Sequence, residues 1–167
     1  RLDHVPTDLV DRARAGLEFL FRVRRRDDES GLITVVHPWE TGADNSPRWD
    51  DFCPGGVDVT RWKQVKGVLL STVERTPGGA PVANPAFPVA PVSFNALVAF
   101  NATELRSVGD ADHGLVREAS ALERALAGRW DDELLTWVDA GPTAQGSGRT
   151  RTADALLPLS AIHQVDQ

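Results

Sequence analysis

The most informative part of the sequence is the stretch Gly31-Leu-Ile-Thr-Val-Val-His-Pro-Trp-Glu-Thr-Gly-Ala-Asp-Asn-Ser-Pro-Arg-Trp-Asp50. Its first part, residues 32–36, is apolar and β-branched, which predicts a short extended segment. From His37 onward the stretch becomes a long connection, with two tryptophans, three carboxylates, one histidine and one arginine in fourteen residues. Ser46 followed by Pro47 is typical of an N-cap and a first helical position, so a short helical turn is predicted there.

Apolar residues recur at helical spacing on both sides of this stretch. Before it, a helix is predicted over residues 6–25, with the basic run 22–26 as its solvated end and Gly31 as its stop. After it, helices are predicted over 58–75, around 94–105, around 115–126 and around 156–162, the last one interrupted by Pro158.

Two further segments lack this spacing. Residues 77–91 contain five prolines and two glycines and are expected to be irregular, whereas residues 130–138 are expected to be extended. The chain is therefore predicted to be mainly α-helical, with minor extended pieces and with its chemistry on the connections between helices.

Length and charge exclude several classes of protein. The 167 residues suit one domain, and a formal net charge of -6 argues against nucleic acid as a partner. No apolar run approaches the ~18 residues of a membrane span, and no secretion signal is visible, so a cytoplasmic protein without a membrane partner is expected. The chain has no methionine, so it is interpreted as a processed chain or a piece of a longer one.

No metal or organic cofactor is predicted. The four histidines are scattered without paired ligand spacing, and the single Cys53 has no partner. Residues 110–114 contain alternating carboxylates and a glycine but lack the later acidic ligand of a calcium loop, so a turn is the favoured interpretation.

The composition of residues 37–50 points toward sugars. A tryptophan in a loop offers a large apolar face, and sugars have apolar C–H faces surrounded by hydroxyl groups. Carboxylates and an arginine beside such a face can bind the hydroxyls. From composition alone, a loop whose tryptophans are buried in a core remains the commoner alternative.

The block from Gly31 to Asp50 closely resembles the signature of inverting α-glycosidases with an (α/α)6 barrel. These are glycoside hydrolase family 63 and the mannosylglycerate/glucosylglycerate hydrolases, whose pattern runs approximately His-Pro-Trp-Glu-Ser-Gly-x-Asp-Asn-Ser-Pro-x-Trp-Asp. The chain departs from this pattern at Thr41, which keeps the hydroxyl group. Weaker likeness covers the segments 94–97, 130–133 and 156–159.

The resemblance implies roles for individual residues. Asp44 falls on the general acid of the family, and His37, Trp39 and Glu40 fall on residues that shape the pocket around the sugar. Trp39 would stack on the sugar, while Glu40 and Arg48 would hold hydroxyl groups or keep the loop in shape. The alternative for Asp44 is an ordinary cap of the following turn.

The acid role carries a physical conflict. A general acid must be protonated, so the pKa of Asp44 has to lie above the ~3.9 of a free aspartate. A helix beginning near Ser46 favours the anion. Burial against Trp39 or Trp49 and the like charge of Glu40 both raise the pKa of Asp44. We expect these two effects to outweigh the effect of the helix once the pocket is closed.

The resemblance also implies that a second carboxyl group is missing. Inverting hydrolysis needs a base that activates water across the sugar from the acid, and in the family this base comes late in the barrel. Glu40 lies on the same loop as Asp44, and Asp139 is disfavoured as a substitute for the base. A twelve-helix barrel needs on the order of 200 residues at least.

The sequence therefore predicts residues 1–167 to be a partial (α/α)6 catalytic domain, about half a toroid built of helical hairpins. The rest of the barrel or self-association would cover its open edges, and a small carbohydrate would be its substrate. Alone, the segment is expected to show no turnover. A non-catalytic carbohydrate-binding domain and a purely structural helical domain are the alternatives.

Overall fold

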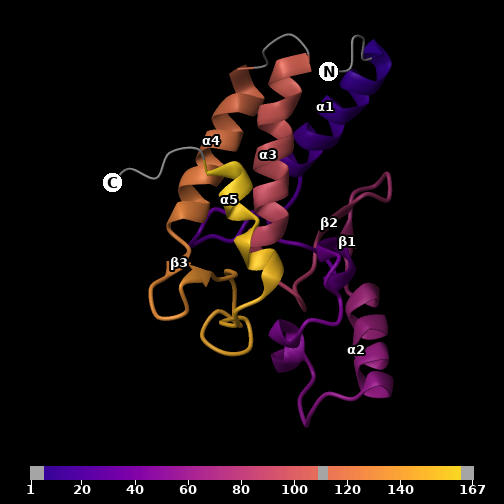
Figure 1. The fold of residues 1–167 in the computed structure, drawn as a ribbon. Coiled ribbons are helices and arrows are strands. Elements are labelled where there is room, and N and C mark those ends of the chain that lie inside the picture. The colour runs from indigo at the N-terminus through magenta and orange to yellow at the C-terminus, as the bar shows by residue number, and fades with distance from the viewer. Residues whose placement is uncertain (1–5, 109–112, 163–167) are drawn as a thin grey trace.

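The computed structural model describes residues 6–108 and 113–162, and these ranges are mainly helical (Figure 1). Three long helices, α1, α3 and α4, lie side by side, and the short α5 packs against α3 and α4. Helix α2 lies at the other end of the molecule. The bounds are α1 Thr7–Arg22, α2 Val59–Ser71, α3 Val92–Val108, α4 His113–Ala127 and α5 Pro158–Ala161.

The larger core lies among α1, α3, α4 and α5. Helix α3 buries Ala96, Ala99 and Ala102 at a spacing of three residues, and these small side chains let α4 approach closely. Helix α4 contributes Leu122 and Leu126, both fully buried. Apolar periodicity alone predicted these helices, and the predictions are confirmed.

A second, smaller core lies around α2 and is aromatic. The Trp49 and Phe87 rings meet edge to face with centroids 5.4 Å apart, and Trp62 of α2 is buried in the same cluster. The other buried members are Val35, Cys53, Leu69 and Val89. The connection that contains the signature is therefore wrapped around an apolar centre of its own.

Two pairs of short strands correct the predictions for irregular and extended segments. β1 (Glu74–Arg75) pairs antiparallel with β2 (Pro81–Ala83), so residues 77–91 are not wholly irregular. β3 (Trp130–Asp131) pairs antiparallel with β4 (Thr136–Trp137), so residues 130–138 form a hairpin rather than one extended piece. The hairpin turns because the Asp131 carboxylate accepts the backbone N–H groups of residues 133 and 134.

The predicted end of the first helix is wrong. Helix α1 ends at Arg22, and Arg24 is buried rather than solvated. The backbone N–H of Arg25 instead donates to the carbonyl oxygen of Val82 in β2. Gly31, with φ +74°, closes a separate turn in which its N–H donates to the carbonyl oxygen of Asp27.

Residues 32–36 are extended as predicted but form isolated bridges instead of a strand. Val35 bridges Val89, and Ile33 bridges Arg26. The buried Asn95 of α3 also binds the backbone of Ile33, accepting its N–H through Oδ1 and donating to its carbonyl through Nδ2. These bonds satisfy backbone groups that are buried away from water.

Short 3₁₀ helices complete the fold. η1 (Pro38–Thr41) and η2 (Pro47–Phe52) lie in the signature, and the turn predicted at Ser46-Pro47 is confirmed by η2. The last predicted helix divides into η3 (Ala153–Leu156) and α5, because Pro158 begins α5 rather than interrupting a longer helix.

The remaining sequence predictions concern the acidic turn and membrane-spanning segments. The acidic turn at 110–114 lies largely outside the described residues. Within the described ranges, no helix is long and apolar enough to cross a membrane.

Candidate functional site

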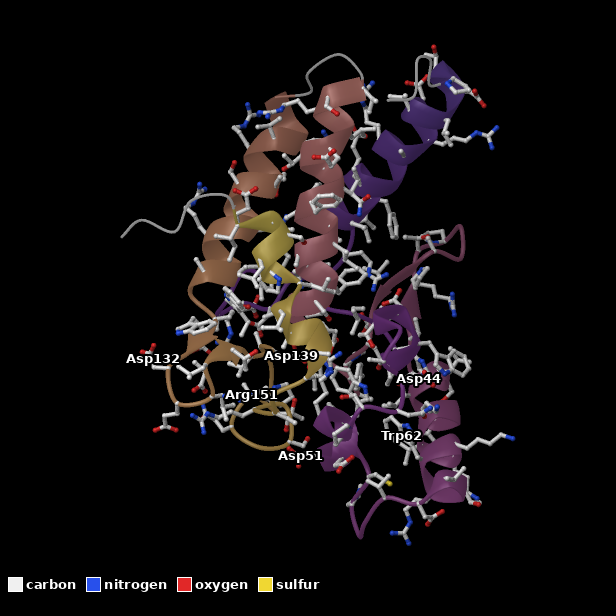
Figure 2. All side chains as sticks on the ribbon, in the orientation of Figure 1. Asp44, Asp51, Trp62, Asp132, Asp139 and Arg151 are labelled. Atoms are coloured by element: carbon white, nitrogen blue, oxygen red, sulfur yellow. The ribbon has the colours of Figure 1, made fainter. Side chains whose placement is uncertain are left out.

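Two indole groups hold the backbone on either side of the Asp44 peptide. Trp49 Nε1 donates to the carbonyl oxygen of Ala43, and Trp62 Nε1 donates to the carbonyl oxygen of Asp44, each at 2.8 Å. Figure 2 shows Asp44 and Trp62 close together beside α2. Both tryptophans are buried, so the aromatic core sets the position of this aspartate.

The Asp44 side chain forms an ion pair with Lys66 of α2. Lys66 Nζ lies 2.8 Å from Asp44 Oδ2, and the Asp44 side chain is 33% exposed. The hydrogen bond from Lys66 lowers the pKa of Asp44 below its usual value, and this effect exceeds the opposing effect of burial. The sequence analysis expects a raised pKa once the pocket is closed, whereas in this chain the contact with Lys66 favours the anion.

His37 and Trp39 form the rim of the loop. His37 is buried, its Nδ1 accepts the Trp39 backbone N–H at 3.2 Å, and its Nε2 lies 3.0 Å from the Lys66 carbonyl oxygen. These partners assign the proton to Nε2, because Nδ1 is used as an acceptor. The Trp39 ring lies against the imidazole with centroids 4.3 Å apart and is 56% exposed, which leaves an aromatic face open to solvent.

Glu40 faces the buried Arg24. Arg24 donates to both Glu40 carboxylate oxygens, and Glu40 Oε2 also accepts the Val36 backbone N–H at 2.7 Å. The carboxylate therefore ties η1 to the segment that follows α1. These contacts match the shape-keeping alternative for Glu40.

Arg48 forms the centre of an ionic cluster with the buried Asp139 and the partly exposed Asp154. Its guanidinium lies 3.3 Å from Asp139 Oδ2, donates to Asp154 Oδ2, and stacks over the Trp49 ring at 4.5 Å. The Arg48 side chain is 2% exposed. A guanidinium enclosed in this way has no face for a sugar, so its geometry supports the role of keeping the loop in shape.

The two carboxyl groups of this cluster have opposite shifts in pKa. Burial raises the pKa of Asp139 to about 6, even though Arg48 and the Val92 backbone N–H favour its anion. Burial also opposes ionisation of Asp154, but its hydrogen bonds and the charge of Arg48 outweigh burial, so the pKa of Asp154 is lowered. The buried Arg48 is thus paired with one partly exposed anion, Asp154, and with one buried carboxyl group, Asp139, whose pKa is about 6.

Asp139 had been considered as a substitute for the missing base. It is buried, paired with Arg48, and located toward the centre of the molecule, away from Asp44 (Figure 2). Because a base must reach water beside the sugar, this position excludes Asp139 from that role.

The structure thus divides the five predicted site residues. Trp39 and Asp44 present side chains to solvent, whereas His37, Glu40 and Arg48 are engaged with the protein. Among the described residues, no three His, Cys, Asp or Glu side chains are grouped to hold a metal ion.

Sequence reasoning missed two residues of this site, both on α2. Trp62 had been counted only as an apolar position of a helix, and Lys66 had not been considered. A weak signal was present, because Lys66 is one of only two lysines in the chain. Neither spacing nor composition shows that α2 folds back onto Asp44.

Comparison with known proteins identifies the family. Residues 6–166 match the mannosylglycerate hydrolase MGH1-like glycoside hydrolase domain. The chain belongs to this family. The resemblance read from the signature is therefore confirmed.

Shorter segments of the chain are similar in sequence to named enzymes. The chain is 62% identical over 29 residues to mannosylglycerate hydrolase MGH1 of Selaginella moellendorffii, which is 17% of this chain and 6% of that protein. It is 44% identical over 50 residues to mannosylglycerate hydrolase of Thermus thermophilus, which covers 24% of this chain and 12% of that protein. It is 34% identical over 55 residues to glucosylglycerate hydrolase of Mycolicibacterium hassiacum, which covers 32% of this chain and 12% of that protein.

Solved structures show the same fold. The crystal structure of GH63 mannosylglycerate hydrolase from Thermus thermophilus in complex with glucose matches with a TM-score of 0.64 at 23% identity, over 95% of this chain and 43% of that one. A complex of the same enzyme with Tris and D-glycerate matches with a TM-score of 0.65 at 19% identity, over 95% and 46%. This chain thus spans less than half of the solved chains, and the predicted mainly helical toroid fold is confirmed.

Proposed function

We propose that this family member acts in the hydrolysis of an α-glucosidic or α-mannosidic bond in a small glycoside similar to glucosylglycerate or mannosylglycerate, with inversion at the anomeric carbon. The observation that carries the proposal is the placement of Asp44. Two indole N–H groups hold its peptide, its carboxyl group reaches solvent, and it lies on the same loop as the open face of Trp39.

Asp44 is assigned as the general acid that protonates the bridging oxygen while the glycosidic bond breaks. Trp39 is assigned to stack on the sugar, with His37 holding its orientation. Glu40 and Arg48 support the loop through Arg24 and through the ionic cluster. The reaction requires no metal ion or organic cofactor in this proposal.

The general base is assigned to polypeptide outside residues 1–167. Neither Glu40, which is bound to Arg24, nor the buried Asp139 can activate a water molecule opposite Asp44. The segment alone is therefore expected to show no turnover.

The open side of the helices is also assigned a partner outside residues 1–167. A groove of about 780 Å³ between α1 and α3 is lined mainly by apolar side chains, including the half-exposed Leu97 and Val108. We assign this groove to contact with the rest of the barrel, since relatives of solved structure are more than twice as long.

The lowered pKa of Asp44 favours a second candidate function for the segment taken alone. An aspartate held as an anion by Lys66 cannot donate a proton, but it can still accept hydrogen bonds from sugar hydroxyls. In this state the chain would be a carbohydrate-binding domain without catalysis.

The decisive experiment measures hydrolysis of glucosylglycerate and mannosylglycerate by proton NMR, which also reports the anomer first released. It uses the 167-residue chain and the longest natural polypeptide that contains it. In the longer polypeptide Asp44→Asn should lower kcat by about 10²–10⁴-fold. Glu74→Gln, which changes an exposed carboxylate in β1 outside this loop, should have little effect.

Three outcomes would contradict the proposal. Unchanged kcat in Asp44→Asn would remove Asp44 as the acid, and turnover by the short chain would show that a base lies within it. Binding of glucose or mannose, detected by tryptophan fluorescence, with no turnover in either protein would favour the binding domain.

A further inference from the structure

A single buried asparagine, Asn84, joins helix α2 to the signature. Asn84 directly follows β2 and is 3% exposed. Its Nδ2 donates to the carbonyl oxygen of Val36 at 2.7 Å and to that of Leu69 at 2.8 Å. Its Oδ1 accepts the backbone N–H of Ala86 at 3.0 Å and lies 2.8 Å from the Thr72 hydroxyl group. All donor and acceptor positions of the amide are therefore occupied.

The orientation of this amide is fixed by its partners. Nδ2 faces two carbonyl oxygens, which can only accept, and Oδ1 faces a backbone N–H group, which can only donate. Turning the amide over, or replacing it by a carboxylate, would place an oxygen against both carbonyl oxygens. Two buried acceptors would then be unsatisfied. The site therefore selects the amide over the carboxylate of the same shape.

The two carbonyl groups that Asn84 holds belong to the two segments that meet at Asp44. Val36 immediately precedes His37, which is the N-cap of η1. Leu69 lies in the last turn of α2, where backbone carbonyl groups lack partners within the helix. One side chain thus connects the start of the signature loop with the end of α2.

Helix α2 has few buried side chains of its own to hold it in place. Figure 1 shows it apart from the bundle of α1, α3 and α4, and of its thirteen residues only Trp62 and Leu69 are buried. Trp62, Lys66 and Leu69 follow one another at intervals of four and three residues, so they lie along one face of the helix. A helix rises about 1.5 Å per residue, so a slip of one residue would carry this whole face about 1.5 Å along its axis.

Such a slip would break the contacts that α2 makes with the site. Trp62 Nε1 donates to the Asp44 carbonyl oxygen, and Lys66 Nζ lies beside Asp44 Oδ2, each at 2.8 Å. His37 Nε2 also lies 3.0 Å from the Lys66 carbonyl oxygen. Hydrogen bonds of this kind are found at about 2.7–3.2 Å. The three contacts therefore require α2 to be held in one register against the signature.

We propose that Asn84 is a positioning residue of the candidate site, because it sets the register of α2 and so brings Trp62 and Lys66 to Asp44. The inference rests on the proposed function, in which Asp44 donates the proton. Asn84 binds the backbone of Val36 and Leu69, so it acts on Asp44 through the helix. A reacting group misplaced by about 1 Å can lower a rate about 10²-fold, so a residue outside the site can control the reaction.

Asn95 of α3 provides a matched comparison. It is fully buried, and its amide likewise binds the segment 32–36, accepting the Ile33 N–H at 2.8 Å and donating to the Ile33 carbonyl oxygen at 2.9 Å. Its remaining bond goes to the Pro91 carbonyl oxygen at 2.9 Å. Replacing either asparagine by alanine leaves buried backbone groups unsatisfied, so both variants should lose comparable stability. Of the two, Asn84 is the one bound to α2.

The first test follows the register of α2 by NMR of the 167-residue chain. Asn84→Ala should move the Trp62 indole N–H signal toward that of an indole in water. It should also raise the pKa of Asp44, read from its carboxyl carbon-13 signal, toward the usual value, because Lys66 moves away. Asn95→Ala should leave both signals unchanged while urea denaturation shows a similar loss of stability.

Two milder variants keep this test usable where Asn84→Ala does not fold. Asn84→Asp keeps the shape of the side chain but removes both donors, and it should change the two signals in the same direction. Thr72→Val removes one contact of the amide from the α2 side and should produce a smaller change of the same sign.

The second test measures hydrolysis of glucosylglycerate and mannosylglycerate by the longest natural polypeptide that contains the chain. Asn84→Ala should lower kcat at least about tenfold while KM changes less than about threefold, because the acid is misplaced and the Trp39 face is kept. Asn95→Ala, at similar stability, should change kcat less than about threefold.

The outcomes separate this inference from the proposed function. Unchanged Trp62 and Asp44 signals in a folded Asn84 variant, or equal changes in Asn95→Ala, would overturn the positioning role while Asp44 stays the acid. A lower kcat with both signals unchanged would overturn it too, since the effect would not pass through α2. Absence of turnover by the wild-type polypeptide would instead overturn the proposed function, and the NMR comparison would still test the register of α2.

Discussion

The helical side and the signature side of this molecule are stabilised by different interactions. Among α1, α3, α4 and α5 the buried residues are mainly aliphatic side chains, many of them alanine and leucine. Around the signature, an aromatic core is joined to an ion-pair cluster of the buried Arg48 and Asp139 with the partly exposed Asp154. Polar bonds at Glu40 and Asp44 add to this side.

The two kinds of contact differ in how strictly they fix the geometry of the molecule. Aliphatic packing is non-directional and tolerates exchange between side chains of similar volume. A buried polar contact needs each partner at a defined distance, and losing one partner leaves the other unsatisfied. The signature side therefore holds a defined loop geometry, which the placement of Asp44 requires.

Removing the central cation should produce the largest effect. Arg48→Ala leaves the buried Asp139 and the partly exposed Asp154 without their partner, and the free energy of unfolding should fall by about 3–5 kcal/mol. Urea denaturation followed by tryptophan fluorescence measures the loss. Arg12→Ala, an exposed arginine on α1, is the control and should change stability by about 0.5 kcal/mol or less.

A loss no larger than that of the Arg12 control would show that the cluster is dispensable. The two sides of the molecule would then not differ in the way described. Backbone amide exchange in the same variant would show whether the loosening is confined to the signature side.

Asp139 should make stability depend on pH. Its folded pKa of about 6 lies above its unfolded value, so its contribution is full below about pH 3.8 and is lost as the pH rises through 6. Between pH 4 and 7 the wild-type protein should lose roughly 2–3 kcal/mol relative to Asp139→Asn, which cannot ionise. Denaturation curves of both proteins at several pH values measure this difference.

A wild-type-to-variant difference that does not change between pH 4 and 7 would contradict the raised pKa. The comparison has to be made with the variant at each pH. Asp44 and Asp154, whose pKa values are lowered, contribute stability that is lost as the pH falls and so act in the opposite direction.

The smallest expected effect on stability is that of Trp39→Ala. The ring is largely exposed and contacts His37, so its removal should cost about 1 kcal/mol or less. The same change should abolish the fluorescence response to glucose or mannose. A loss of several kcal/mol would show that Trp39 belongs to the core, and an unchanged sugar response would remove it from the binding site.

Sequence reasoning predicted the helices well where one apolar face repeats over several turns. It was wrong at residues 22–26, because a run of arginines is usually solvated and here Arg24 is buried and paired with Glu40, sixteen residues away. It also missed both strand pairs, each of which depends on a turn and on contacts with other segments.

The residues of the candidate site could be predicted only in part. The signature singled out Asp44 and Trp39, which the structure leaves accessible. It could not show that Lys66 would be paired with Asp44, because that contact depends on where α2 packs. Nor could it show that Lys66 would lower the pKa of Asp44 in this chain.

The family and the helices could be inferred from the amino-acid sequence, because a specific signature and apolar spacing are properties of neighbouring residues along the chain. Which charged side chains pair depends instead on how the chain folds in space. Arg48 pairs with carboxyl groups 91 and 106 residues away, and Asp44 with a lysine 22 residues away. Electrostatic energy depends on distance and burial in space, and neither quantity is determined by position in the chain.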